Sequence, residues 1–467
     1  MIVTIMSYLL DFSLGNYRVF NFSASCLFAL SLCYLLFNQQ YLIAAFGLGM
    51  YLVQITGILL NIYFDQIRAS GWLVMDIFKP DYLNIANLTL VVSIACFLYV
   101  GMLFGKNNSK SLRRNDQNDR YQFKSLVEIS LLIFLTGSTL TILSAPSSLV
   151  ESGYGGGQAE FAEPSSFGYI IGLSLLCSSI FMFLYKRKKT DWLSMFFLLS
   201  GVLIVINFNL LRGDRDGTLT FFVTLFAAYF IYSKKSGLGK VLRLSIGGVG
   251  LYLVLIFMGE IRTQVKNLGF SGAISQSTLL AGSRGDSNIF EKLDLLPMMY
   301  WHLLDAIDLC ANGIDYDYRS FKNLPVQALP GGVSNTLGID RPRNAAWDLE
   351  EYKLHGGGFF IVGEAYWNKG IWSAVGFTGI LALLLHLVER WFYRQKKYLL
   401  GFYFALVATF PTCIYYGIQG MFRWIEVYFF FALMIKVLIW LYAEISRYRK
   451  QGYYVSLRKL LSLTQSN

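Results

Sequence analysis

The stretch YLIAAFGLGMYLVQITGILLNIY, residues 41–63, decides the fold class because it contains no charged residue. A helix needs about 20 apolar residues to cross the hydrocarbon core of a bilayer, and this run is long enough. Ten further runs of this kind lie at 19–37, 85–105, 126–144, 167–185, 192–211, 218–233, 244–258, 370–389, 399–417 and 425–443. The sequence therefore predicts an all-α, polytopic membrane helix bundle with eleven spans. The first residues, 1–14, form either an interfacial helix or part of a twelfth span.

The overall composition agrees with this prediction. The chain has 467 residues, of which 55% are hydrophobic and 15% charged, with a mean hydropathy of +0.48. Soluble domains carry about 25% charged residues. The net charge of +11 does not indicate a nucleic-acid partner, because the basic residues cluster in short loops between apolar runs. The six cysteines lack metal-ligand or CxxC spacing, so we interpret them as packing residues.

The distribution of lysine and arginine predicts the orientation, because cytoplasmic loops of membrane proteins are enriched in these residues. Five basic segments fall on one side when the spans are threaded: 106–124, 186–189, 234–243, 390–397 and the tail from Arg447. The external side then receives 65–84, 145–166, 212–217, 259–369 and 418–424. This gives N-terminal membrane helices (1–258), a long external loop (259–369) and C-terminal helices with a cytoplasmic tail (370–467). Within the loop, 295–310 is amphipathic and predicts a helix that lies on the membrane surface or caps the bundle.

The segment NFNLLRGDRDGTLTFF, residues 207–222, places four charges between two apolar runs: Arg212, Asp214, Arg215 and Asp216. One interpretation is a tight hairpin, since Asp-Gly suits a turn and arginine can extend to the lipid headgroups. A second is a metal-diphosphate site, because DRD has the DxD form found in many glycosyltransferases. The flanking arginines oppose a divalent cation. A third interpretation, in which the aspartates orient the arginines around an anionic ligand, is therefore favoured.

Further arginines lie on the same predicted side, where basic residues are otherwise disfavoured. They are Arg262, Arg284, Arg341, Arg343 and Arg423. The planar guanidinium pairs bidentately with phosphate oxygens, so several of them together suit a diphosphate at the membrane surface. The sequence predicts no bound metal and no cofactor. Each arginine taken alone also fits an ordinary surface or ion-paired residue.

The segment HGGGFFIVGEAYWNKGIW, residues 355–372, precedes a predicted span. Its three consecutive glycines let the backbone approach a ligand or another helix closely. Glu364 follows in an apolar and aromatic setting. A carboxylate that is desolvated there, or paired with an arginine, suits a general base that takes a proton from a sugar hydroxyl. His355 is a second candidate base. The structural alternative for Glu364 is a carboxylate favoured by the dipole at a helix N-terminus. His302 and His386 are interpreted as structural.

The chain resembles the bacterial Wzy-type polymerases of O-antigen, capsule and related polysaccharides. The resemblance rests on many spans, the arginine-bearing turn RGDRDG, a long external loop and the glycine-rich segment at 355–372. It implies a membrane fold related to the GT-C glycosyltransferases and the O-antigen ligases, with essential external arginines at Arg215, Arg262 and Arg284. Ligases of the wider group carry a functional histidine in a comparable position, whereas the nearest residue here is Glu364, with His355 upstream.

The resemblance also implies a reaction and a set of partners. The implied reaction joins two undecaprenyl-diphosphate-linked glycans on the periplasmic side of the inner membrane and releases undecaprenyl diphosphate. The expected partners are the lipid-linked oligosaccharide, membrane lipid and a chain-length regulator. Aromatic residues of the long loop are expected to stack on sugars: Tyr300, Trp301, Tyr316, Tyr318 and Trp347. The alternatives are a ligase or other GT-C transferase, a flippase for lipid-linked oligosaccharides, and a non-catalytic membrane scaffold.

Overall fold

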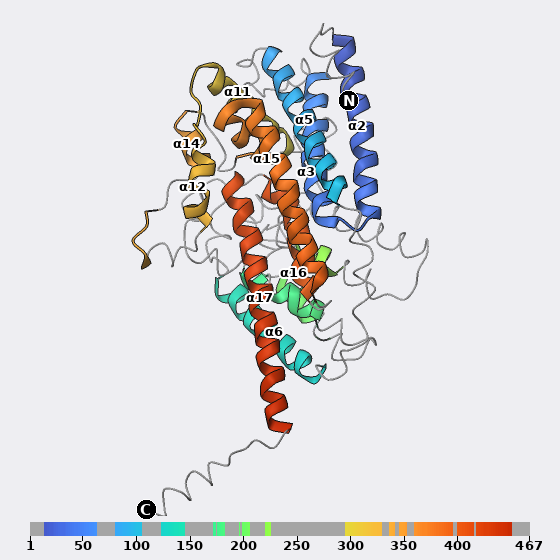
Figure 1. Cartoon of the computed structure of the whole chain (residues 1–467), viewed down its shortest axis with the longest axis vertical. Helices are drawn as coiled ribbons and strands as arrows, with labels where there is room; N and C mark the ends of the chain where they lie inside the picture. Colours follow the sequence, from blue (N-terminus) through green and yellow to red (C-terminus); the bar gives the residue numbers. More distant parts are fainter. Residues whose placement is uncertain are drawn as a thin grey trace, which may run out of the picture.

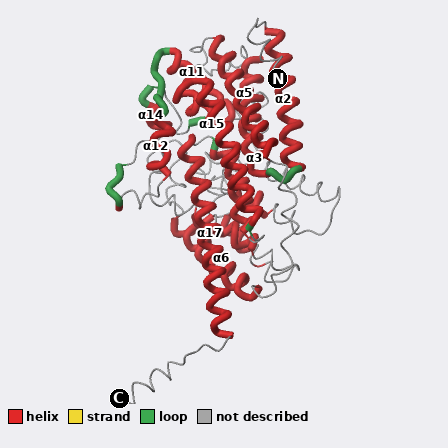
Figure 2. Tube along the Cα trace, in the orientation of Figure 1, coloured by secondary structure: helices red, strands yellow, loops and turns green. Residues whose placement is uncertain are grey.

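A computed structural model gives the fold of the chain. It describes residues 14–62, 80–104, 123–144, 171–173, 175–182, 196, 199–205, 220–225, 295–328, 336–340, 345–352, 359–395, 399–414 and 417–450. Helices make up the regular structure of these residues, and no β-strand occurs among them (Figure 2). The prediction of an all-α membrane bundle is confirmed.

The N-terminal half contributes four apolar helices: α2 (Leu14–Phe37), α3 (Tyr41–Ile62), α5 (Pro80–Phe104) and α6 (Phe123–Ser144). Their bounds lie close to the predicted spans. Hydroxyl side chains inside them donate to carbonyls one turn earlier, as Thr56 does to Leu52 O at 2.9 Å and Thr89 to Ile85 O at 2.7 Å. Such bonds let polar residues sit within an apolar helix, because their donors are satisfied without water.

The second half contributes α11 (Leu295–Ala311), α12 (Arg319–Ala328), α14 (Ala345–Glu350), α15 (Ile361–Arg394), α16 (Leu400–Cys413) and α17 (Gly417–Lys450). The central helix is α15, which packs against α3, α5, α11 and α17 (Figure 1). The helix α11 also packs against α3 and α5, and its Tyr300, Leu303 and Leu304 are fully buried. Of the two expectations for 295–310, a position on the membrane surface is excluded, and packing against the bundle agrees with the other.

Three described helices are long and apolar enough to cross a membrane: Tyr82–Phe104, Ile361–Arg394 and Gly417–Tyr442. Shorter apolar helices accompany them at Asn21–Phe37, Tyr41–Gly57, Ile129–Leu143, Ile171–Met182 and Leu400–Thr409. The total of eleven or twelve spans stays a prediction, because several predicted spans fall partly or wholly outside the described residues.

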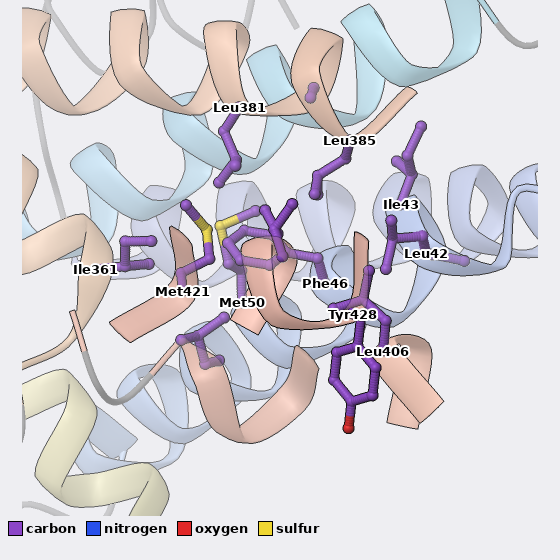
Figure 3. Packing of buried hydrophobic residues seen from close by; sticks show 14 of the residues in the cluster. Leu42, Ile43, Phe46, Met50, Ile361, Leu381, Leu385, Leu406, Met421 and Tyr428 are labelled. Atoms are coloured by element: carbon purple, nitrogen blue, oxygen red, sulfur yellow. The ribbon is translucent and has the colours of Figure 1, made fainter. Parts of the chain in front are cut away.

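One hydrophobic core joins both halves of the chain. Figure 3 shows buried side chains of α3, α15, α16 and α17 in one cluster, among them Phe46, Met50, Leu385, Leu406 and Met421. Lipid tails are as apolar as these side chains, so tight packing rather than removal from water is what associates membrane helices. The core therefore fixes α15 against helices from both ends of the sequence.

A buried polar cluster ties the C-terminal part of α15 to the start of α3. Glu389, which is 0% exposed, accepts hydrogen bonds from Leu42 N at 3.1 Å and from the Tyr403 hydroxyl. The Tyr393 hydroxyl donates to Gln39 O and lies 3.2 Å from the Tyr403 hydroxyl. A carboxylate at a helix N-terminus satisfies backbone N–H groups that have no partner within the helix. Glu389 thus caps α3 from a position late in the sequence.

Candidate functional site

The candidate site lies where α15 begins, and a break inside this helix shapes it. Lys369 has φ −170° and ψ 43°, and Gly370 has φ +73° and ψ −162°. Glycine is the residue that adopts such a positive φ without strain. The break separates a short segment, 361–368, from the long apolar part of α15 that follows.

Residues 314–320, which we call the strap, run beside the last residues of α15 before the break. Two backbone hydrogen bonds hold it there. Tyr316 N donates to Trp367 O at 2.9 Å, and Tyr318 N donates to Asn368 O at 3.4 Å. In a continuous helix these carbonyls would accept from N–H groups four residues later, and the break removes those partners. The break in α15 therefore creates the acceptors that hold the strap.

The first turn of α15 is held by neighbouring elements. Phe360 N donates to His302 Nδ1 at 3.0 Å, and Ile361 N donates to Ile414 O at 2.9 Å. These bonds satisfy N–H groups that have no partner inside the helix. A Cβ on Gly363 would lie only 3.1 Å from His302 O, so glycine lets α15 approach α11 closely. His302 has the structural role predicted for it.

Glu364 lies inside the first turn of α15, because the helix starts at Ile361 and not at the predicted residue 370. Its side chain is buried, and Oε2 accepts a hydrogen bond from Ile418 N at 2.8 Å. Gly417, with φ +75°, lies so close that a Cβ there would be 2.5 Å from Oε2. The carboxylate is therefore at the N-terminus of its own helix and also caps α17. Among the described residues, no arginine forms an ion pair with it.

Asn368, one turn after Glu364, connects α15 to α12. It is 0% exposed, its Nδ2 donates to Glu364 O at 2.7 Å, and its Oδ1 accepts from Ser320 N at 3.2 Å. A buried amide with both ends bonded fixes its neighbours, because breaking either bond leaves a polar group unsatisfied away from water. Asn368 thus anchors the end of the strap beside the segment that carries Glu364.

Stacked aromatic rings join the strap to the segment before the break in α15. The Tyr316 and Trp367 rings stack with their centroids 4.2 Å apart, and the Arg319 guanidinium lies 5.2 Å from the Tyr316 ring centroid. Burial raises the pKa of Tyr316 well above its usual value, so its hydroxyl stays protonated and donates to Asp348. The strap is therefore fixed by side chains as well as by its backbone.

The aromatic residues that the sequence assigned to sugar stacking differ in exposure. Tyr300 is fully buried against α3 and α5, so a sugar cannot reach its ring. The ring packs so closely on Gly57 that a Cβ there would lie 2.3 Å from it. Trp301 packs against the main core, and Tyr316 is stacked on Trp367. Tyr318 and Trp347 are each 43% exposed, so these two present ring surface that a glycan can reach.

The structure describes two of the charged residues predicted for the site. They are Glu364 and Arg423, and Arg423 is exposed on α17, the helix whose start Glu364 caps. The other predicted residues lie outside the described residues: Arg212, Asp214, Arg215, Asp216, Arg262, Arg284, Arg341, Arg343 and His355. The glycines at 356–358 also lie outside them.

Sequence reasoning did not identify Asn368 or Ser320 as members of the site. A signal for Asn368 was present, because it is a polar residue four positions after Glu364 and therefore on the same helix face. The adjacent Lys369-Gly370 pair was also a signal for a break. Ser320 carried no comparable signal, since its contact with Asn368 joins residues 48 positions apart.

Apolar helices packed around a shared core, with a buried carboxylate at a helix junction, define an integral membrane protein of the all-α bundle class. The family model of the O-antigen polysaccharide polymerase Wzy matches residues 1–279, more than half of the chain. The chain belongs to this family, which implies a glycosyltransferase-type enzyme that acts on a lipid-linked oligosaccharide in a membrane. No curated protein and no solved structure matches the chain. The matched region includes RGDRDG and Arg262 and ends before Arg284 and Glu364.

Proposed function

We propose that this polymerase transfers a growing undecaprenyl-diphosphate-linked glycan onto an incoming lipid-linked repeat unit on the external face of the inner membrane. The observation that carries the proposal is the family match, because it spans the arginine-bearing turn at 212–217 together with Arg262. Guanidinium groups at that position suit the diphosphate that both lipid-linked substrates carry. We also propose that the membrane fold of this chain is related to that of the GT-C glycosyltransferases.

The proposed chemistry is a displacement at the anomeric carbon of the growing chain. A hydroxyl of the incoming repeat unit forms the new C–O bond, and the bond from the anomeric carbon to the diphosphate oxygen breaks. Arg215, Arg262 and Arg284 stabilise the negative charge that develops on the leaving undecaprenyl diphosphate. Glu364 or His355 takes the hydroxyl proton.

The geometry of Glu364 is compatible with the role of base. The Ile418 N–H group occupies one acceptor position on Oε2, and an ionised carboxylate has about four such positions. Its buried surroundings keep water away, which strengthens its interaction with a bound hydroxyl. Arg423 lies in α17 shortly after Ile418, whose N–H group donates to Glu364, so the two predicted site residues share this helix junction.

The family match favours a polymerase over a ligase, which would use the same donor with a different acceptor. The direct test is reconstitution of the purified protein in vesicles with isolated lipid-linked repeat units. A ladder of products that differ by one repeat unit is expected. Transfer of glycan to a different acceptor without a ladder would indicate a ligase, and movement of intact units across the bilayer without transfer would indicate a flippase.

Polymerisation is expected not to require a divalent metal. Arg212 and Arg215 flank the aspartates at 214 and 216, and their positive charge opposes a bound cation. The ladder produced by the reconstituted protein should therefore persist in EDTA. If chelation abolishes the ladder and magnesium or manganese restores it, the aspartates bind a metal-diphosphate instead.

The predicted orientation can be tested in intact cells. A cysteine introduced at Ser334, in the predicted external loop, should react with a membrane-impermeant thiol reagent, whereas one at Ser109 should not. The reason is that residues 106–124 are strongly basic and are predicted to be cytoplasmic. Reaction at Ser109 alone, or at both positions, would contradict the orientation and with it the external active site.

A chain-length regulator is the expected protein partner on that external side.

A further inference from the structure

The segment 361–368 carries Glu364 on two turns of helix that are separated from the rest of α15. At its start, His302 and Ile414 accept the N–H groups of Phe360 and Ile361. At its end, the break at Lys369 and Gly370 interrupts the helix. The position of Glu364 therefore depends on contacts with other elements, since helix continuity with the long apolar part does not fix it.

Within this segment, the side chain of Asn368 hydrogen-bonds to both the backbone of Glu364 and the strap. Its Nδ2 donates to Glu364 O at 2.7 Å, while its Oδ1 accepts from Ser320 N at 3.2 Å. Its own carbonyl accepts from Tyr318 N at 3.4 Å. Both side-chain bonds are buried, so water does not replace them when the amide is removed.

Two other side-chain links join the strap to this end of α15: a part-buried hydrogen bond from Trp367 Nε1 to Ile314 O at 3.0 Å, and an exposed ion pair. Lys369 Nζ lies 2.6 Å from Asp315 Oδ2, but the two side chains are 47% and 40% exposed. Ion pairs that are exposed to solvent contribute little to holding a structure. The amide of Asn368 therefore makes the fully buried side-chain hydrogen bond between the strap and the segment that carries Glu364, in addition to the backbone bonds of the strap.

From this geometry we infer that Asn368 is a positioning residue for glycosyl transfer. It locks the segment 361–368 onto the strap, so that the Glu364 carboxylate stays fixed between Ile418 N and the acceptor hydroxyl. The inference rests on the proposed function, in which Glu364 is the base. A displacement of about 1 Å at a reacting group is enough to lower a rate by about 100-fold. Loss of the amide should thus lower kcat for polymerisation and leave the KM for the lipid-linked unit nearly unchanged.

The experiment compares purified variants reconstituted with lipid-linked repeat units isolated from cells. Asn368→Leu keeps the branching pattern of the side chain, with a somewhat larger volume, and removes both hydrogen bonds. Asn312→Leu is the matched control, because Asn312 is exposed and its amide bonds only within its own helix end, to Asp308. We expect kcat to fall about 10- to 100-fold for Asn368→Leu, as for a mispositioned group. The control should keep the wild-type rate.

A double variant separates positioning from general damage to the fold. If Asn368 acts through Glu364, adding Asn368→Leu to Glu364→Gln should not lower the remaining rate further. Independent losses that multiply, or a wild-type kcat for Asn368→Leu, would overturn the inference while leaving Glu364 as the base. A wild-type rate for Glu364→Gln alone would instead overturn the proposed base. If Asn368→Leu does not accumulate in the membrane, Asn368→Ala, which also removes both side-chain hydrogen bonds, replaces it with the same expected outcomes.

Discussion

Replacing Arg215 with lysine is expected to lower polymer formation by about 100-fold, and replacing it with alanine is expected to nearly abolish it. Lysine keeps the charge but loses the planar fork that binds two phosphate oxygens at once. Removing one preorganised donor from a charge-stabilising site typically costs about 100- to 1,000-fold in rate. The measurement is the length distribution of polymer in cells that carry each variant at matched membrane levels.

A control separates this effect from a general need for basic residues. Arg114→Lys changes an arginine in the basic loop 106–124, which is predicted to be cytoplasmic, and it should give the wild-type ladder. Both Arg215 variants should insert and fold normally, because a bundle held by its apolar helices does not depend on one charged residue in a turn. Wild-type ladders from Arg215→Lys and Arg215→Ala would show that the turn only closes a hairpin, and the proposed diphosphate site would be lost.

The second large effect is expected at Glu364. Glutamine keeps a carbonyl oxygen that can accept the hydrogen bond from Ile418 N, but it cannot take a proton. Glu364→Gln should therefore fold normally and lose about 100- to 10,000-fold in kcat, the usual contribution of a general base. Glu364→Ala should lose activity and also stability, because the start of α17 then has no cap. Rates and thermal unfolding of the purified variants test both expectations.

The conservative variant distinguishes a base from a structural cap. A near wild-type rate for Glu364→Gln, with impaired folding for Glu364→Ala, would show that the carboxylate only caps α17. His355 would then be the remaining candidate base. Glu351→Gln, at an exposed position of the predicted external loop, is the matched control and should leave the rate unchanged.

The spans that the structure describes could be predicted from the sequence because length and hydropathy define them. The start of α15 could not, since the break at Lys369 and Gly370 made the polar residues before it look like a loop. The sequence also left two positions open for 295–310, on the membrane surface or against the bundle. Its hydrophobic face and its buried polar residues, such as Asp305, gave an amphipathic pattern, although α11 is enclosed by other helices.

The candidate site was only partly predictable for a related reason. A carboxylate in an apolar setting is unusual enough to identify Glu364 from sequence. Its partner Ile418 is 54 positions away and contributes a backbone N–H, which no side-chain pattern reveals. The same holds for Asn368 and Ser320. Contacts made through the backbone across long separations depend on the packing of helices, and a single sequence does not specify it.

The two carboxylates of α15 bear on how the chain is assembled during synthesis. Glu364 supplies the cap of α17, which is made after it, whereas Glu389 supplies the cap of α3, which is made long before it. When ribosomes have produced only the first helices, the N–H group of Leu42 therefore has no carboxylate to bind. Leu42 lies at the predicted cytoplasmic end of its span, where water can occupy the place of the carboxylate. The hairpin of α2 and α3 can therefore insert early, and it receives its cap from the protein itself only when residue 389 has been inserted.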